Sequence, residues 1–157
     1  MGGCKGENGR TRVVVVGSES PGRCLAAGAV LTDCIGEHGW SERLSVGVAG
    51  FGSGAGRPSK TDLGALSAAG VECPAEACPA LGQDPEILEE ADVLVACERV
   101  DAERLIEMDE SMGKQVMTLS ELLGDYALPA AALDELLARL REAMPLLVRR
   151  LVATGPA

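Results

Sequence analysis

The sequence predicts an α/β protein of three layers, in which a four-stranded parallel sheet lies between helices. Four short apolar runs indicate the strands, at 12–16, 44–50, 92–98 and 115–119. The first of them is a continuous run of valines, which is typical of a strand buried on both faces. Because segments of helical spacing separate these runs, the strands are expected to pair in parallel through right-handed crossovers.

Helices are expected between the strands and after the last one, at 24–39, 60–70, 85–91, 102–108 and 130–153. Gly39 and Gly70 are predicted to end the first two of them, and Ser59 or Thr61 to begin the second. Pro145 lies inside the last helix and is expected to kink it. The segments at 51–59 and 71–85 are predicted to be loops, the first rich in glycine and the second in proline.

The length of 157 residues predicts one domain over 11–154, and the polar segment at 1–10 is expected to be a disordered tail. Apolar residues make up 46% of the chain, but only Trp40, Phe51 and Tyr126 are aromatic. The core must therefore consist mainly of Val, Leu and Ala.

Charge and cysteine pattern exclude several function classes. The net charge of −10 argues against nucleic acid and anionic membranes as partners, because both require clustered Lys and Arg. No apolar run is long enough to span a bilayer and no signal peptide is recognisable, so a cytoplasmic location is expected. The six cysteines are scattered and the chain has one histidine. The sequence therefore predicts reduced thiols, no metal site and no cofactor.

The segment at 17–23, "GSESPGR", joins the first strand to the first helix and is the strongest candidate for a binding site. A helix N-terminus carries unpaired N–H groups and a partial positive charge, which suit an anion. Gly17 and Gly22 permit the backbone angles of an anion-binding loop, and Arg23 adds a planar guanidinium. The hydroxyls of Ser18 and Ser20 complete the polar lining, or serve only to cap the helix.

Two residues of the same loop oppose anion binding. Glu19 places a carboxylate in the proposed loop, and Pro21 removes one amide donor. An ordinary strand-to-helix turn with a capping serine therefore remains the competing interpretation.

The order of these elements resembles the low-molecular-weight protein tyrosine phosphatase family, which includes thioredoxin-coupled arsenate reductases. The resemblance covers about 11–151 and rests on "RVVVVGSESPGRCLAAGAVL", "LSVGVAGFGSG", "GALSAAGVE", "EEADVLVACERVDAERLIEM" and "KQVMTLSELLGDYALP". It implies a phosphate-binding loop at 17–23 and a fold of the phosphotyrosine protein phosphatase I type. It also implies Phe51 and Tyr126 as the only aromatic side chains at the mouth of the site.

The chain departs from this family at the residues that carry its reaction. The family loop begins with a nucleophilic cysteine and ends with arginine, with five residues between them. Here the same spacing is kept, but Gly17 stands at the first position and Arg23 at the last. Cys24 follows the arginine, where the family has a supporting hydroxyl, and its side chain is expected to point away from the loop. The family's general acid is an Asp before Pro, and no Asp-Pro pair occurs at that place in this chain. One alignment makes Asp125 a structural residue upstream of the acid, and another brings it within one residue of the acid position.

The resemblance and these departures from it are compatible with two alternative functions. The first is a catalytically inactive phosphatase-fold protein, or pseudophosphatase, that serves as a binding or regulatory module for a protein or a small anionic metabolite. The second is an enzyme with different chemistry in the same pocket, in specialised metabolite or peptide biosynthesis, with Arg23, Glu19 and Asp125 as its catalytic residues. The predicted ligand-binding residues are Gly17, Ser18, Glu19, Ser20, Gly22, Arg23, Phe51 and Tyr126. A homodimer through the pocket face is compatible with the Leu, Val and Ala content.

Overall fold

The computed structural model describes residues 11–18, 21–52, 56–68, 70, 79–80, 86–108, 115–119 and 133–154. Its strands are β1 (Thr11–Gly17), β2 (Leu44–Gly50), β3 (Val93–Ala96) and β4 (Gln115–Thr118). Its helices are α1 (Pro21–Glu37), α2 (Lys60–Ala68), α3 (Glu86–Glu90), α4 (Arg99–Met108) and α6 (Leu133–Thr154). The strands form one parallel sheet in the order β2-β1-β3-β4, which confirms the predicted fold class.

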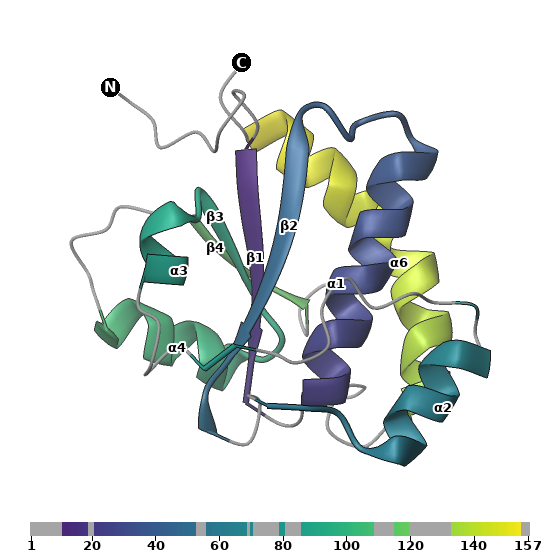
Figure 1. Ribbon diagram of the computed structural model, residues 1–157. Coiled ribbons are helices and arrows are strands. Elements are labelled where there is room, and N and C mark those ends of the chain that lie inside the picture. The colour runs from purple at the N-terminus through teal and green to yellow at the C-terminus, as the bar shows by residue number, and fades with distance from the viewer. Residues whose placement is uncertain are drawn as a thin grey trace.

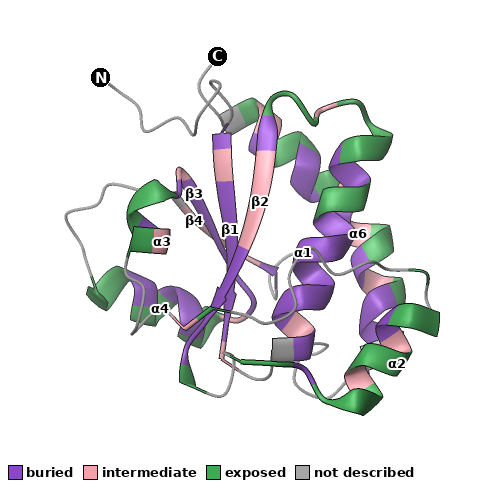
Figure 2. Ribbon diagram, viewed as in Figure 1, coloured by how far each residue is buried: buried purple, intermediate pink, exposed green. Residues whose placement is uncertain are grey.

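The sheet separates two groups of helices, with α1 and α6 on one face and α3 and α4 on the other (Figure 1). Successive side chains of β1 point to opposite faces of the sheet, so this strand contributes to two separate parts of the core. Val13 and Val15 join the cluster under α1 and α6, whereas Val14 and Val16 join the cluster under α3 and α4. β1 is accordingly buried almost throughout, as a continuous valine run predicts (Figure 2).

The last helix supplies a large part of the first cluster. Its buried side chains recur at helical spacing: Leu136, Leu137, Leu140, Met144, Leu147, Val148 and Leu151. Pro145 lies inside α6, and the helix continues on both sides of it. On the same face of the sheet, α1 packs closely on β2 at Gly28, which has no side chain. A β-carbon on Gly28 would stand only 2.5 Å from Val48 Cγ1.

The predicted capping residues Ser59, Gly39 and Gly70 lie at helix boundaries, whereas α1 and α4 each begin three residues before the expected start. Gly39 and Gly70 have φ of 75° and 73°, which glycine adopts without strain at a helix end. The N–H of Asp62 donates to Ser59 Oγ at 3.1 Å, so Ser59 rather than Thr61 begins α2. α1 begins at Pro21, three residues before the predicted start, because proline suits the first helical position.

None of the helices within the described ranges combines the length and the apolar character that crossing a membrane requires.

Candidate functional site

Three strand ends meet at the carboxyl edge of the sheet, where open α/β sheets bind their ligands. β1 ends at Gly17, and α1 begins at Pro21 directly beyond it. Phe51, the residue after β2, donates its N–H to the Gly17 carbonyl at 3.0 Å. Cys97, the residue after β3, donates its N–H to the Val16 carbonyl at 2.8 Å. The structure therefore brings the start of the predicted loop together with residues from β2 and β3.

Two sulfur atoms occupy the space beside Gly17. A β-carbon on Gly17 would stand 2.8 Å from Cys24 Sγ, 3.0 Å from Cys97 Sγ and 3.4 Å from Cys97 Cβ. Real β-carbons essentially never approach a heavy atom closer than 3.0 Å, so any side chain at position 17 would displace at least one of these thiols. Neither Cys24 nor Cys97 is in a disulfide, and both are buried, with exposed fractions of 1% and 7%.

The orientation expected for Cys24 is wrong. Its side chain was predicted to point away from the loop along α1, but its sulfur faces Gly17. The physical reason is that α1 begins at Pro21 and not at Cys24. Cys24 therefore lies inside the first turn and not at the helix start, and its side chain packs in the cluster between α1 and the sheet.

Ser18 is held by a buried carboxylate on the neighbouring strand-to-helix connection. Its Oγ donates to Asp101 Oδ1 at 2.6 Å, and Asp101 is fully buried. The second oxygen of Asp101 accepts the N–H of Glu98 at 3.2 Å, while the Asp101 N–H donates to the Glu98 carbonyl at 3.1 Å. The Asp101 side chain thereby caps the N-terminus of α4, as the third helical residue of a capping box does. Asp101 thus connects that helix start to the residue after Gly17.

Asp101 was missed by reasoning from the sequence, although a signal for it existed. It follows β3 by five residues, and β3 pairs with β1 through Val16 and Ala96. The carboxyl ends of adjacent parallel strands lie at the same edge, so the first turn after β3 had to face the first residues after β1. An acidic residue three positions beyond Glu98 was also consistent with helix capping.

A second carboxylate lies against the start of α1. A β-carbon on Gly22 would stand 2.7 Å from Asp62 Cγ and 2.9 Å from Asp62 Cβ, so the Asp62 side chain packs directly on the Gly22 backbone. Gly22 is needed here for close approach, and it has no positive φ. This contact places the Asp62 carboxylate of α2 beside the positive N-terminal end of α1, an arrangement that stabilises α1.

Arg23 lies in the first turn of α1 and is half-buried. The remaining predicted site residues in this part of the chain, Glu19 and Ser20, lie outside the described residues, as do Asp125 and Tyr126. Their proposed roles in binding and catalysis stay predictions. The structure brings together Gly17, Ser18, Gly22 and Arg23, because all four belong to the end of β1 or the start of α1.

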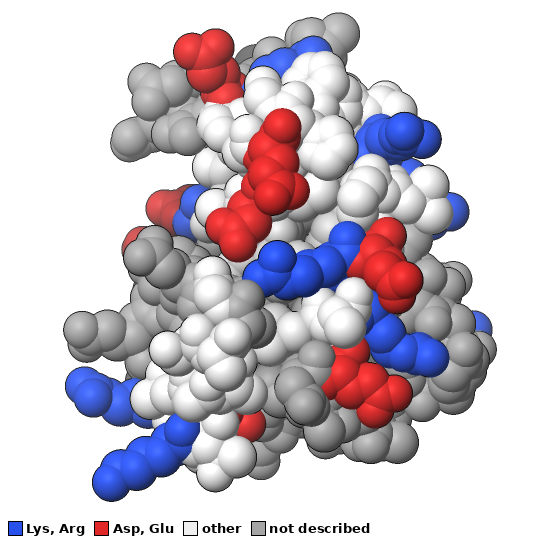
Figure 3. Space-filling view, turned by 90° about the vertical axis from the view of Figure 1, so that its right-hand side faces the viewer, with Lys and Arg blue, Asp and Glu red and all other residues white. Residues whose placement is uncertain are grey.

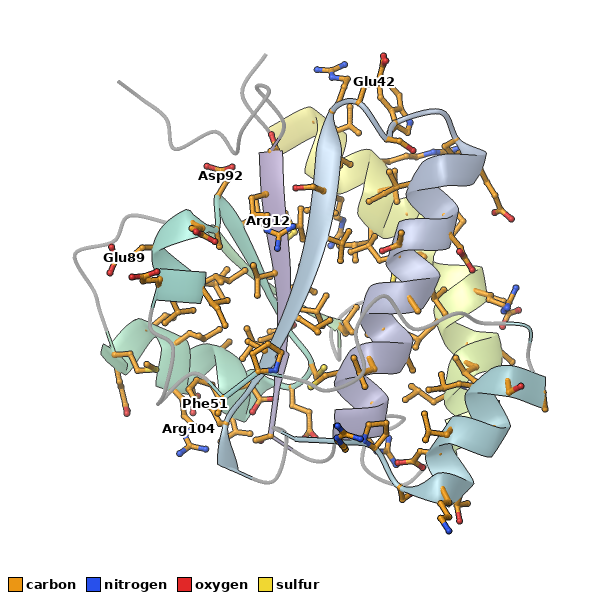
Figure 4. All side chains as sticks on the ribbon, viewed as in Figure 1. Arg12, Glu42, Phe51, Glu89, Asp92 and Arg104 are labelled. Carbon is orange, nitrogen blue, oxygen red and sulfur yellow. The ribbon has the colours of Figure 1, made fainter. Side chains whose placement is uncertain are left out.

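Phe51 packs beneath an arginine. Its ring belongs to the cluster under α3 and α4 and is 8% exposed. The guanidinium carbon of Arg104 on α4 lies 4.7 Å from the ring centroid, a cation–π contact (Figure 4). A ligand that approaches this side of the edge would therefore meet a positive charge above the aromatic ring. Nothing in the sequence around Arg104 indicates this contact.

The single histidine lies away from this edge, after the last turn of α1. Its Nδ1 lies 3.6 Å from Cys34 Sγ and 2.9 Å from the Cys34 carbonyl oxygen. Burial raises the pKa of the Cys34 thiol, and the nearby charge of Glu37 raises it further. Cys34 is therefore held in its unreactive protonated form.

The described residues lack a metal-binding cluster, and the face that Figure 3 draws lacks a basic surface among them. Within these ranges no three His, Cys, Asp or Glu side chains are grouped to hold a metal ion. On the face that carries α1, α2 and α6, basic and acidic side chains are interspersed (Figure 3). A continuous positive surface for nucleic acid is absent from the described residues of that face.

The comparisons with known proteins identify the fold. No protein-family model matches the sequence, and no curated protein matches it. Among solved structures, YfkJ from Bacillus subtilis is similar with a TM-score of 0.77 at 16% identity, over 96% of this chain and 100% of that one. A low-molecular-weight protein tyrosine phosphatase from T. tengcongensis gives 0.72 at 18%, over 89% and 99%. YwlE arginine phosphatase from Geobacillus stearothermophilus gives 0.69 at 18%, over 94% and 99%. The chain therefore has the fold of low-molecular-weight phosphatases.

Proposed function

We propose that this protein is a phosphatase-fold binding module without cysteine-dependent phosphatase activity. One observation carries the proposal: the space in which a side chain at position 17 would stand is filled by the sulfurs of Cys24 and Cys97. In the family that the sequence resembles, the nucleophilic cysteine begins the loop, which corresponds to Gly17 here. Phosphoryl transfer through a phosphocysteine requires a thiolate at that position.

The two neighbouring thiols are poor replacements for such a nucleophile. Both are buried and belong to the hydrophobic cluster between α1 and the sheet. A substrate phosphate at the helix N-terminus would be attacked only by a group that reaches the loop surface.

The carboxyl edge keeps the features that favour an anionic group. α1 is 17 residues long and begins at the loop, so its first turn provides N–H donors and a partial positive charge. Arg23 lies in that turn, and Arg104 covers Phe51 nearby on the same edge. Since the similar solved structures are named as tyrosine and arginine phosphatases, the proposed ligand class is a phosphorylated side chain of a protein partner.

Asp62 limits how tightly this edge holds a free anion. Its carboxyl group packs against Gly22, so it competes with an incoming anion for the positive end of α1. A protein partner supplies further contacts around the phosphate, whereas inorganic phosphate does not. The proposed module therefore prefers a phosphorylated segment to the free ion.

Binding of inorganic phosphate, phosphotyrosine and phosphoarginine tests the proposal, measured by NMR chemical-shift titration of the full chain. The expected result is binding that Arg23→Ala weakens about tenfold or more, since charge-assisted hydrogen bonds to arginine contribute about 1.5–3 kcal/mol. Arg149→Ala, an exposed position on α6, is the matched control and should bind as the unmodified chain does. Equal affinity in Arg23→Ala, or no shift with any of the three ligands, would contradict the proposal.

A second candidate is an enzyme with different chemistry at the same edge, and the Ser18–Asp101 hydrogen bond favours it. A serine hydroxyl that donates to a carboxylate at 2.6 Å has the arrangement of an activated nucleophile. In this proposal Glu19, Arg23 and Asp125 supply the remaining charged groups. A fluorophosphonate probe should then label Ser18 and spare Ser18→Ala. If mass spectrometry finds no label on Ser18, this second candidate should be abandoned.

A further inference from the structure

Cys24 and Cys97 approach the same point beside Gly17 although they lie far apart in the sequence. Their sulfurs lie 2.8 Å and 3.0 Å from the position of a β-carbon on Gly17. We propose that these two thiols form a reversible disulfide under oxidising conditions, which makes the pair a redox modification site. The proposal does not rest on the proposed function, because it concerns only the two thiols and the space between them.

The geometry favours this pair over any other pair of described cysteines. Disulfides join β-carbons about 3.5–4.5 Å apart, so the two side chains must already face each other. Cys24 reaches the point from the first turn of α1, and Cys97 reaches it from the residue after β3. Gly17 has no side chain to separate them. The third described cysteine, Cys34, lies nearly three turns farther along α1, beside His38.

Hydrogen peroxide is the oxidant that balances the reaction. The Cys97 thiolate, the more exposed of the two at 7%, attacks one peroxide oxygen. The O–O bond breaks, Cys97 becomes a sulfenic acid, and the departing hydroxide takes up the thiol proton as water. The Cys24 sulfur then attacks the sulfenic sulfur, the S–O bond breaks, and a second water leaves. Two thiols and one peroxide thus give one disulfide and two waters, and a dithiol reductant reverses the change.

The bond would join the two elements that frame the predicted loop. Cys24 belongs to the turn that contains Arg23, and Cys97 adjoins Glu98, whose N–H donates to Asp101. Asp101 in turn holds Ser18. Oxidation would therefore fix the start of α1 to the end of β3 and restrain both sides of the edge.

Peptide mapping identifies the bond without ambiguity. The folded protein is treated with hydrogen peroxide, free thiols are blocked with N-ethylmaleimide, and the chain is digested with trypsin and Asp-N without reduction. These enzymes release Cys24 in CLAAGAVLT and Cys97 in DVLVACER, each with a single cysteine. The expected product is these two peptides joined, and dithiothreitol should separate them. The oxidised protein should also unfold about 5–10 °C higher, as expected for a disulfide that closes a long loop.

Three variants test the pairing. Cys97→Ser should eliminate the linked peptide and the rise in Tm, whereas Cys34→Ser, which removes the other described buried thiol, should leave both unchanged. Gly17→Ala keeps both thiols but places a methyl group between them, and should form the bond about tenfold more slowly, equivalent to about 1.4 kcal/mol in the barrier. The proposal is overturned if the unmodified chain yields no linked peptide, or if Cys24 is found joined to a cysteine other than Cys97.

Discussion

Cys24 Sγ lies 2.8 Å from the point at which a β-carbon on Gly17 would stand. The residue that ends β1 and the residue that follows Arg23 therefore fit together only because position 17 is glycine. This relationship connects the fold to the proposed function, since it places the buried thiol of Cys24 beside the point where a side chain at the start of the loop would lie.

Adding a single methyl group at position 17 should destabilise the protein. Gly17→Ala forces the new β-carbon against the two sulfurs, and overpacking of this kind costs about 1–3 kcal/mol of unfolding free energy. Urea denaturation measures the change. The control is Gly64→Ala on α2, where a β-carbon meets nothing within 4 Å and should stabilise the helix by about 0.5–1 kcal/mol.

A double variant separates the packing conflict from other effects of the new methyl group. Cys24→Ala removes the nearest sulfur, so Gly17→Ala should cost less in that background. The expected coupling is about 0.5–3 kcal/mol, as for residues in direct contact. Strictly additive losses would show that the two positions do not compete for the same space.

Removing the buried carboxylate of Asp101 should loosen the carboxyl edge. Asp101→Ala removes the acceptor of the Ser18 hydroxyl and of the Glu98 N–H, at a cost of about 0.5–1.5 kcal/mol for each hydrogen bond lost. Amide hydrogen exchange should become faster in the first turn of α4. Glu103→Gln, at an exposed position of the same helix, should leave exchange unchanged; equal acceleration in both variants would refute the role of Asp101.

Neutralising Asp62 should strengthen anion binding at the start of α1. Asp62→Asn keeps the shape of the side chain packed on Gly22 but removes its charge. The affinity for phosphotyrosine should rise about two- to fivefold, which corresponds to about 0.3–1 kcal/mol for a charge at a helix end. The control is Glu37→Gln, which removes a charge at the opposite end of α1 and should leave the affinity for phosphotyrosine unchanged. Weaker binding by Asp62→Asn would mean that its carboxylate assists the ligand.

Cys34 should make the folded state less stable at alkaline pH. Burial and Glu37 raise the pKa of its thiol in the folded protein, so the folded state retains the proton after the unfolded chain has lost it. Between the unfolded and folded pKa values the unfolded state binds fewer protons, and stability therefore falls as pH rises. In urea titrations at increasing alkaline pH, the stability advantage of the unmodified chain over Cys34→Ala should shrink. A constant difference across that range would contradict the raised pKa.

The sequence predicted the fold because its local signals agreed with one another. The valine run of β1, the glycines after α1 and α2, and the leucine spacing of α6 each determine an element without reference to distant residues. The side-chain relationships at the edge could not be predicted in this way. The Cys24 and Cys97 sulfurs meet at Gly17 only because the sheet places β3 beside β1.

Arg104 and Asp62 illustrate the same limit. Each occupies an ordinary position on a helix surface, and nothing in its local sequence indicates a partner. Their contacts with Phe51 and Gly22 depend on how α4 and α2 pack at the carboxyl edge. The prediction for Cys24 failed for a related reason, since a shift of three residues in the start of α1 changed the direction of its side chain.

Hydrolysis of p-nitrophenyl phosphate by the purified full chain tests whether the protein lacks cysteine-dependent phosphatase activity. We expect no release of p-nitrophenol above that of a parallel preparation of Arg23→Ala, under reducing conditions and over the neutral pH range. Turnover by the unmodified chain that Arg23→Ala abolishes, and that Cys24→Ser or Cys97→Ser also removes, would show that a thiol at this edge is catalytic and would contradict the proposed function.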